Sequence, residues 1–437
     1  MTEQRTTGAV ETPREGPAAG SESRGEVEAD KGGGRTGAGA GQVRLFSVPA
    51  LVASCVGFAL IGALQSFYGP AIPALREEFG LSPAAAGVGL TAHFIGGVGG
   101  VLAFNRVHDR VGNRLLLGVS YALMAAGSLG FALAPAWPPA LAAAFVAGLG
   151  FGGIDYGLNQ LFAVGFGSRS TAMLNVLNAF FGIGAVAGPA LIGLLGSDRY
   201  TVVFAGCGLV SAALLLFLRG VRDRSPAPVR APDGAADARP AAPARARVRF
   251  LLLAFVVLYV LHVGVEAGVG GWEPTHLESV GYGSAFAASA TSVFWLMMTV
   301  GRFLVVPLTL RWPEHVIINI SCAGMAVCLA AATVPALAPY MYAGVGLFIA
   351  PVFPTGLPWL TRTVPMARSA SAHVIAASML GGVAAGPALG AMIQWAGARS
   401  VPVVLCVIAL LCLASSMWID RTTRPRGQDQ AASPRRR

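Results

Sequence analysis

The feature that most constrains this chain is a series of apolar runs, each long enough to cross a lipid bilayer. A membrane-spanning helix needs about 20 mostly apolar residues, and charge within such a span is costly. Only 12% of the 437 residues are charged, whereas soluble domains carry about 25%. Twelve runs meet the length requirement, at 48–75, 83–107, 114–134, 139–165, 170–196, 199–218, 250–276, 284–306, 314–335, 337–362, 370–396 and 400–418. The sequence therefore predicts an all-α protein of the lipid bilayer with twelve transmembrane helices.

The apolar runs fall into two sets of six, separated by a stretch dominated by Ala, Pro and Arg that cannot form a core. The N-terminal residues contain no apolar run, which predicts disorder and no signal peptide. Gly69-Pro70 interrupts the first run, so we expect an irregular boundary there. The expected segments are a disordered cytoplasmic tail (1–45), an N-terminal six-helix bundle (46–219), a cytoplasmic linker (220–249), a C-terminal six-helix bundle (250–419) and a basic cytoplasmic tail (420–437).

The two sets of runs carry an internal repeat. Gly188-Pro189-Ala190-Leu191 in the fifth run recurs as Gly386-Pro387-Ala388-Leu389 in the eleventh. The Gly-rich stretches that begin at Gly148 and Gly346 have the same separation. Two six-helix halves in parallel register are typical of transporters that are built from repeats.

Basic side chains are concentrated in alternate loops. Arg106, Arg110 and Arg114 lie between the second and third runs, and the linker is rich in Arg. The loops of the other side carry few basic residues, and we expect Glu273 and Glu278 to make the loop after the seventh run acidic. By the positive-inside rule, both termini are predicted to be cytoplasmic in a multi-pass protein of the cell membrane.

Several other classes of function are excluded by the same sequence. The net charge is +10, but the arginines are not interleaved with aromatic residues and no zinc or RNA-binding motif is present, so we expect no nucleic-acid partner. The six cysteines lie in apolar runs without a CxxC pair, which argues against disulfides and a metal site. No nucleophile elbow and no P-loop occurs, so neither an enzyme nor a single-chain ATP-driven pump is expected. We also expect no cofactor.

Two carboxylates lie inside predicted spans, where an ionisable group is by default a functional candidate. Asp155 lies in the fourth run and Glu266 in the seventh, and each is a candidate to carry a proton. Asn159 and His262 are each four residues from one of these acids, so each shares a helix face with it. The Asp155–Asn159 pair is suited to binding a polar solute or to bonding another helix. The His262–Glu266 pair is suited to proton relay, while a lone His would be a packing residue.

Further polar residues within the spans are candidates for binding a solute. Gln65 occupies the position in the first run that corresponds to Glu266 in the seventh, and Asn175 and Asn178 share a face of the fifth run. Trp272 follows a cluster of glycines and is suited either to stacking on a sugar or to a position in the aromatic belt at the membrane surface. We expect Arg302 to extend toward the cytoplasmic surface.

The loop between the second and third helices resembles a motif of the major facilitator superfamily. That motif reads G-x-x-x-D-[RK]-x-G-[RK]-[RK], and Asp109, Arg110, Gly112 and Arg114 match it, while Asn105 replaces its first glycine. The resemblance implies the major facilitator fold. It also implies that this loop forms a gate between the two halves on the cytoplasmic side, with the Asp near a helix N-terminus.

A second resemblance covers the fourth and fifth helices. It rests on Gly148, Gly150, Asp155, Asn159, Leu174, Asn175, Asn178, Phe180, Gly182, Gly184, Gly188 and Pro189. This order resembles the fucose–proton symporter branch of the superfamily, which implies that the acidic residue of the fourth helix is a proton or substrate site. Gly69 stands where the fucose symporter has an Asp, so one of the two ionisable positions is missing.

A competing resemblance is to the drug–proton antiporters. The residues Gly184, Gly188, Pro189 and Gly193 partly match their fifth-helix motif, but Ile192 replaces one glycine. The first hypothesis is therefore proton-coupled uptake of a sugar or similar small polar solute by a monomer. The alternatives are proton-antiport efflux of a drug or secreted metabolite, and a membrane-embedded sensor that transports nothing.

Overall fold

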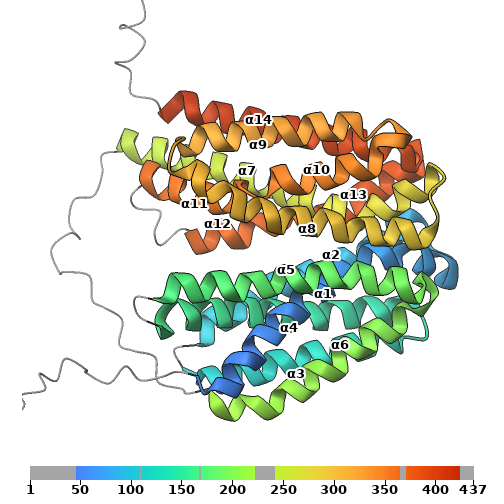
Figure 1. Cartoon of the computed structure of the whole chain (residues 1–437). Coiled ribbons are helices and arrows are strands. Elements are labelled where there is room, and N and C mark those ends of the chain that lie inside the picture. The colour runs from blue at the N-terminus through green and yellow to red at the C-terminus, as the bar shows by residue number, and fades with distance from the viewer. Residues whose placement is uncertain (1–45, 109, 167–168, 222–241, 365–370, 424–437) are drawn as a thin grey trace, which may run out of the picture. The chain divides into compact units, whose positions relative to one another are not determined.

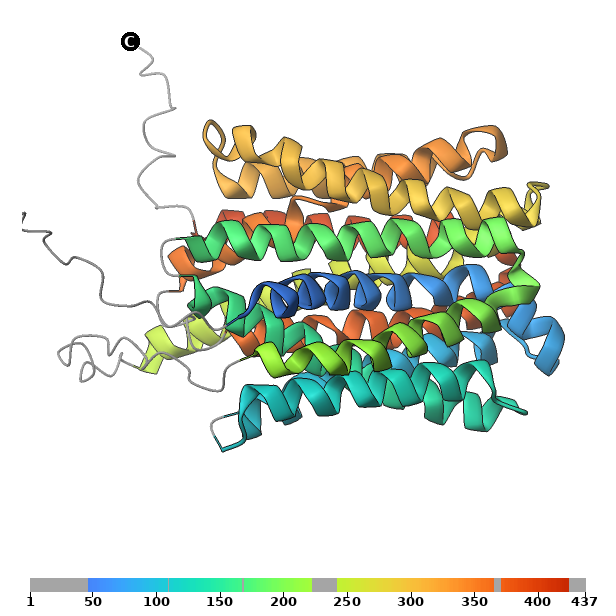
Figure 2. The ribbon, with the colours of Figure 1, turned by 60° about the horizontal axis from the view of Figure 1, so that its bottom comes forward.

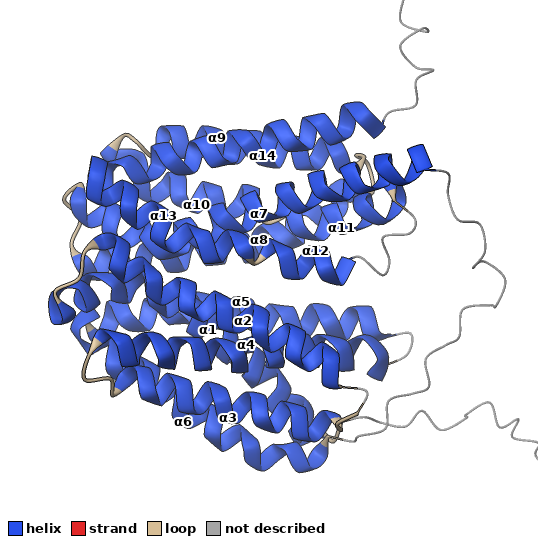
Figure 3. Ribbon diagram, turned by 180° about the vertical axis from the view of Figure 1, so that it is seen from behind, coloured by secondary structure: helices blue, strands red, loops and turns tan. Residues whose placement is uncertain are grey.

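The computed structural model describes residues 46–108, 110–166, 169–221, 242–364 and 371–423. Almost all of these residues are helical (Figure 3), and the one extended pairing among them is a bridge between Phe46 and Val221. Twelve helical segments are long and apolar enough to cross a membrane. The prediction of twelve spans is confirmed, and the expected tail at 1–45, most of the linker (222–241) and residues 424–437 lie outside the described residues.

The N-terminal half contains six spans. Serine hydroxyls cap the first two helices, because Ser47 accepts from the Ala50 amide at 3.3 Å and Ser82 from the Ala85 amide at 3.2 Å. The helices are α1 (Val48–Phe79), α2 (Pro83–Val107), α3 (Asn113–Ala132), α4 (Trp137–Gly165), α5 (Ser170–Leu195) and α6 (Tyr200–Leu214), with the short 3₁₀ helices η2 (Ser197–Arg199) and η3 (Leu215–Gly220) flanking α6.

The C-terminal half contains the other six spans, two of which are divided. The tenth span is α10 followed by α11, divided at Pro351, and the eleventh is α12 followed by α13. The helices are α7 (Ala242–Ser279), α8 (Ser284–Thr309), α9 (Glu314–Ala331), α10 (Ala338–Ile349), α11 (Val352–Thr363), α12 (Ser371–Ser378), α13 (Leu380–Ala396) and α14 (Val401–Thr423), with the 3₁₀ helices η4 (Pro335–Leu337) and η6 (Ala398–Ser400).

Several boundaries differ from those expected. The first helix continues through Pro70 and Pro73 to Phe79, because a proline is tolerated in a membrane helix whose neighbours compensate the lost hydrogen bond. Helix α7 begins within the predicted linker and extends to Ser279. The acidic loop expected after the seventh run is therefore wrong, since Glu273 and Glu278 belong to α7. The last helix extends to Thr423, beyond the expected boundary at residue 419.

Glycines allow the helices of the N-terminal half to pack closely. A methyl group at Gly148 of α4 would overlap the backbone oxygen of His93 in α2, and one at Gly152 would overlap that of Gly97. Helices α1 and α5 meet in the same way at Gly62. Close approach of backbones through small residues is the usual way in which helices associate in lipid.

The most extensive contacts between the two halves are those of α1 with α7, α2 with α13, and α5 with α8. We call the end of the bundles where α1 begins and α14 finishes the tail end, and the opposite end the far end (Figures 1 and 2). Gly69 meets the backbone of Gly270, and the Thr91 hydroxyl donates to the Val383 oxygen at 2.6 Å. Toward the far end, Gly193 meets Ser289. These contacts between the halves extend from the middle of the spans to the far end.

Candidate functional site

Helix α7 brings His262 and Glu266 together near the middle of its span. The two residues are one turn apart, and the His262 Nε2 atom lies 3.8 Å from a carboxylate oxygen of Glu266. The His262 side chain is only 3% exposed, whereas that of Glu266 is 17% exposed. The expected pair therefore exists, and Glu266 is its more accessible member.

Two other helices supply partners for Glu266. The Gln65 side chain of α1 hydrogen-bonds to the Glu266 carboxylate, so this contact crosses from one half to the other. Arg302 of α8 interacts electrostatically with both Glu266 and His262. The expectation that Arg302 extends toward the membrane surface is therefore wrong. Long side chains on a helix point toward its N-terminus, which for α8 is the far end, and a facing carboxylate stabilises the guanidinium there.

The second set of polar residues lies in the N-terminal half, on α4 and α5. The Asn159 Nδ2 atom donates to the Asp155 Oδ1 atom at 3.0 Å and to the Asp155 backbone oxygen at 3.0 Å. Asn178 of α5 approaches Asn159, with its Nδ2 atom 3.5 Å from the Asn159 Oδ1 atom. Asn175 is exposed one turn earlier on α5. The amides thus connect the Asp155 carboxyl to an exposed face of α5.

The two polar sets combine different chemical abilities. Asp155 and Glu266 are the carboxyls that can take up and release a proton. The Asn159 amide next to Asp155, and the Gln65 amide and His262 imidazole next to Glu266, can stabilise the protonated or the ionised form of each carboxyl. Amide groups that donate and accept hydrogen bonds can hold the hydroxyls of a polar solute. Within the described ranges no hydrogen bond or ion pair connects Asp155 to Glu266, so the two carboxyls are separate sites in this conformation.

Trp272 lies in a different environment from either expected position. Its side chain is fully buried in the core of the C-terminal half, and its indole nitrogen has no hydrogen-bond partner. Full burial excludes a place in the aromatic belt at the membrane surface. Contact of its ring with a solute would require another conformation of α7 and α8.

The loop that resembles the superfamily motif lies at the tail end. Gly112 is the N-cap of α3 in an extended conformation, and Arg110 and Arg114 have exposed side chains. Asp109 lies outside the described residues, so the expected gate residues are only partly placed. Asn105, which replaces the first glycine of the motif, accepts a hydrogen bond from the Tyr156 hydroxyl at 2.5 Å.

Sequence reasoning missed Glu273. Its side chain is completely buried in α7, although it was expected in a loop. The repeat carried a usable signal, because Glu273-Pro274 corresponds to Ile72-Pro73 and Ile72 is a buried helical residue.

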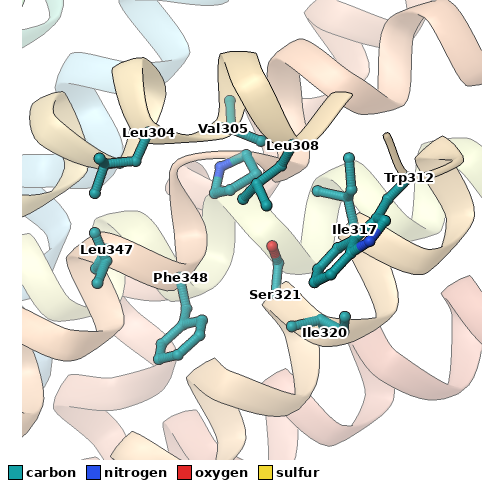
Figure 4. A pocket seen from close by; sticks show the side chains of 11 residues that line it. Leu304, Val305, Leu308, Trp312, Ile317, Ile320, Ser321, Leu347 and Phe348 are labelled. Carbon is teal, nitrogen blue, oxygen red and sulfur yellow. The ribbon is translucent and has the colours of Figure 1, made fainter. Parts of the chain in front are cut away.

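A hollow in the surface of the C-terminal half is not part of either polar set. Its volume is about 180 Å³, and its lining side chains are apolar except for the Ser321 hydroxyl and the indole nitrogen of Trp312 (Figure 4). The other lining residues are Gly301, Leu304, Val305, Leu308, Trp312, Ile317, Ile320, Leu347, Phe348 and Pro351. Apolar side chains at membrane depth favour lipid chains over a polar solute.

Comparison with known proteins identifies the family. The model of the Major Facilitator Superfamily matches residues 54–372. No curated protein sequence matches the chain. The xylose transporter XylE from E. coli, in a partially occluded inward-open conformation, superposes with a TM-score of 0.68 at 13% identity, covering 86% of this chain and 99% of that one. The nucleoside transporter NupG gives 0.69 at 14% identity, covering 85% and 99%.

A third solved structure is a bacterial homologue of the human lysosomal transporter Spinster. It superposes with a TM-score of 0.68 at 15% identity, covering 86% of this chain and 97% of that chain. These likenesses show the shared fold of twelve helices in two halves. From the family match and the fold together, the chain is a multi-pass membrane transporter, not an enzyme, and it belongs to the Major Facilitator Superfamily.

Proposed function

We propose that this protein is a proton-coupled carrier that takes up a sugar or similar small polar solute by alternating access. The observation that carries the proposal is the position of Glu266. This carboxyl lies near the middle of a span, is partly accessible, and is held by Gln65 from the other half. A group shared between the halves changes its surroundings when the halves move, which is the requirement for coupling protonation to transport.

The N-terminal half supplies support of a different kind. Asp155, Asn159 and Asn178 join a carboxyl to two amides on neighbouring helices, an arrangement suited to binding hydroxyl groups. Among the structures with the same fold is one described as a D-xylose–proton symporter, and another is a nucleoside transporter. Both descriptions concern small polar solutes, so such compounds are the first to test.

Under this proposal, the conformation is an inward-open state. The arginine-rich loops support a cytoplasmic position for the tail end by the positive-inside rule. The contacts between the halves extend from the middle to the far end. On this reading the external side is closed, and Glu266 and Asp155 are reached from the cytoplasm.

Export of a drug or metabolite is the alternative, and it rested on glycines of the fifth helix. A methyl group at Gly184 would overlap the backbone of Ala59, and one at Gly188 would overlap the hydroxyl of Ser66. Both glycines therefore have a packing role against α1. Packing against α1 explains why glycines occur at these positions of the fifth helix without requiring an antiport mechanism. We therefore propose uptake rather than export.

The test is accumulation of radiolabelled xylose, other sugars and nucleosides by proteoliposomes under an inward proton gradient. We expect at least one solute to accumulate, and we expect Glu266→Gln and Asp155→Asn to abolish the accumulation. Glu77→Gln is the matched control, because Glu77 is an exposed acid at the far end of α1. Accumulation that survives both substitutions would show that neither carboxyl couples protons to transport.

A further inference from the structure

Glu273 is a buried acid that the proposed function does not use. Its side chain is 0% exposed, and neither carboxyl oxygen has a hydrogen-bond partner of good geometry. The groups that interact with it are the Thr291 hydroxyl of α8 and the Tyr342 hydroxyl of α10. No cation is among its neighbours in the part of the chain that the structure describes. An ionised carboxylate without a counter-charge at such a site is strongly disfavoured, so the carboxyl carries a proton in this conformation.

Glu273 belongs to a stripe of titratable residues along one face of α7. The stripe consists of His262, Glu266, Glu273 and His276, whose spacings of four, seven and three residues keep them on the same side of a helix. Its last member, His276, shares a hydrogen bond of 3.0 Å with the Tyr342 hydroxyl. The stripe therefore extends from the middle of the span to the far end.

The groups that face this stripe come from several elements. Thr291 and Tyr342 face Glu273, and Arg399 of η6 acts on His276. Gln65 and Arg302 face Glu266. The cationic partners thus lie on either side of Glu273, with Arg302 beside His262 and Glu266 and Arg399 beside His276. Glu273 lies between these partners without a charge of opposite sign nearby. Of the four residues in the stripe, it is therefore the one whose charged form depends most on water for stabilisation.

Contacts between the halves cover α7 on both sides of Glu273 along the helix. Gly69 and Gly270 meet backbone to backbone, and a methyl group at Gly271 would lie 3.2 Å from Leu90. Near the end of the helix, Arg76 of α1 interacts electrostatically with Glu278 of α7. These contacts must separate before the far end can open. Opening therefore supplies the water that an ionised Glu273 requires.

We propose that Glu273 is a second proton-carrying residue, which binds a proton from the far-end solution and thereby closes the far end. Water at the far end delivers the proton to a carboxylate oxygen, and the reverse step returns it to water with the carboxylate left behind. This inference rests on the proposed function for its place in a transport cycle. The conformation with the closed far end accepts only the protonated form of Glu273. Acid therefore favours the closed far end, and alkali favours the open one.

The test measures the far end directly, in lipid vesicles that contain the full chain and no solute. Spin labels are attached through a keto amino acid at positions 77 and 284, which are exposed at the far ends of α1 and α8, so the native cysteines stay. Electron–electron resonance then gives the distance between the halves as a function of pH. In the parent protein we expect the open-to-closed ratio to rise with pH, by at most about tenfold per pH unit for one linked proton.

The variants separate proton binding from a structural role. Glu273→Gln mimics the protonated form, so its far end should remain closed across the pH range. Glu78→Gln is the control, since Glu78 is an exposed acid of the same end that bonds to Tyr200 at 2.7 Å, and it should keep the pH response. A pH response that persists in Glu273→Gln, or its absence in the parent protein, would overturn the inference.

A folding defect of Glu273→Gln would not end the test. Glu273→Asp keeps a titratable group but shortens it, so the midpoint of the distance change should move along the pH axis. An unmoved midpoint would show that another group controls the opening. Since no solute is present, these outcomes are independent of whether any sugar or nucleoside is transported, and failure of the uptake proposal is distinguishable from failure of this one.

Discussion

At the residue scale, the Glu266 site depends on groups from three helices. His262 precedes Glu266 on α7, Gln65 comes from α1 and Arg302 from α8. The guanidinium and the carboxylate stabilise each other at membrane depth, where either alone would be costly. This mutual dependence can be measured through the stability of the folded protein.

Removing Arg302 should destabilise the protein more than removing both charges. Arg302→Met leaves Glu266 without its cation, and we expect a loss of roughly 1–3 kcal/mol, below the ~3–5 kcal/mol of a fully buried pair because both groups are partly exposed. The double variant with Glu266→Gln should recover part of this loss. Thermal unfolding of the single and double variants in detergent gives the coupling energy. Additive effects would contradict the pairing of the two charges.

The sequence predicted those site residues that share one helix. Asp155 with Asn159, and His262 with Glu266, were found because a spacing of four residues fixes the neighbour. The Gln65–Glu266 contact was anticipated only as equivalent positions of a repeat. The position of Arg302 was predicted wrongly because its partner Glu266 lies on another helix. The spacing of residues within one helix does not show which other helix packs against it.

At the element scale, the crossing of α2 and α4 depends on glycine. A side chain at Gly148 would overlap the His93 backbone oxygen, which cannot move without shifting α2. The hydropathy of the sequence predicted both helices but not how closely they approach. It also suggested a break at Pro70, whereas α1 continues to Phe79, since the tolerance of a proline depends on the neighbouring helices.

A substitution at this crossing should lower stability sharply. We expect Gly148→Val to cost about 1–3 kcal/mol by overpacking. Gly206→Ala is the matched control, because no atom lies within 4 Å of the position of its added methyl group. That variant should be neutral or slightly stabilised, as alanine favours a helix over glycine. Equal melting temperatures for Gly148→Val and the parent protein would show that the helices are not packed this closely.

At the scale of the whole molecule, the two halves are joined from the middle to the far end. Their contacts involve glycine backbones at Gly69 and Gly270, the hydrogen bond from Thr91 to Val383 and the hydrogen bond between Gln65 and Glu266. Small residues and few polar bonds allow two bundles to separate and rejoin. The repeat in the sequence predicted the two halves. Whether the halves meet toward the tail end or the far end depends on the conformation, and residue spacing could not predict it.

The most direct test of the account is the movement of protons with the solute. Proteoliposomes without a pH gradient are supplied with a solute found in the uptake assay, and the external pH is recorded with an impermeant dye. The account predicts that the external medium becomes more alkaline as solute enters, and that Glu266→Gln abolishes this change. Solute entry without any change of external pH, or with acidification, would contradict proton-coupled uptake.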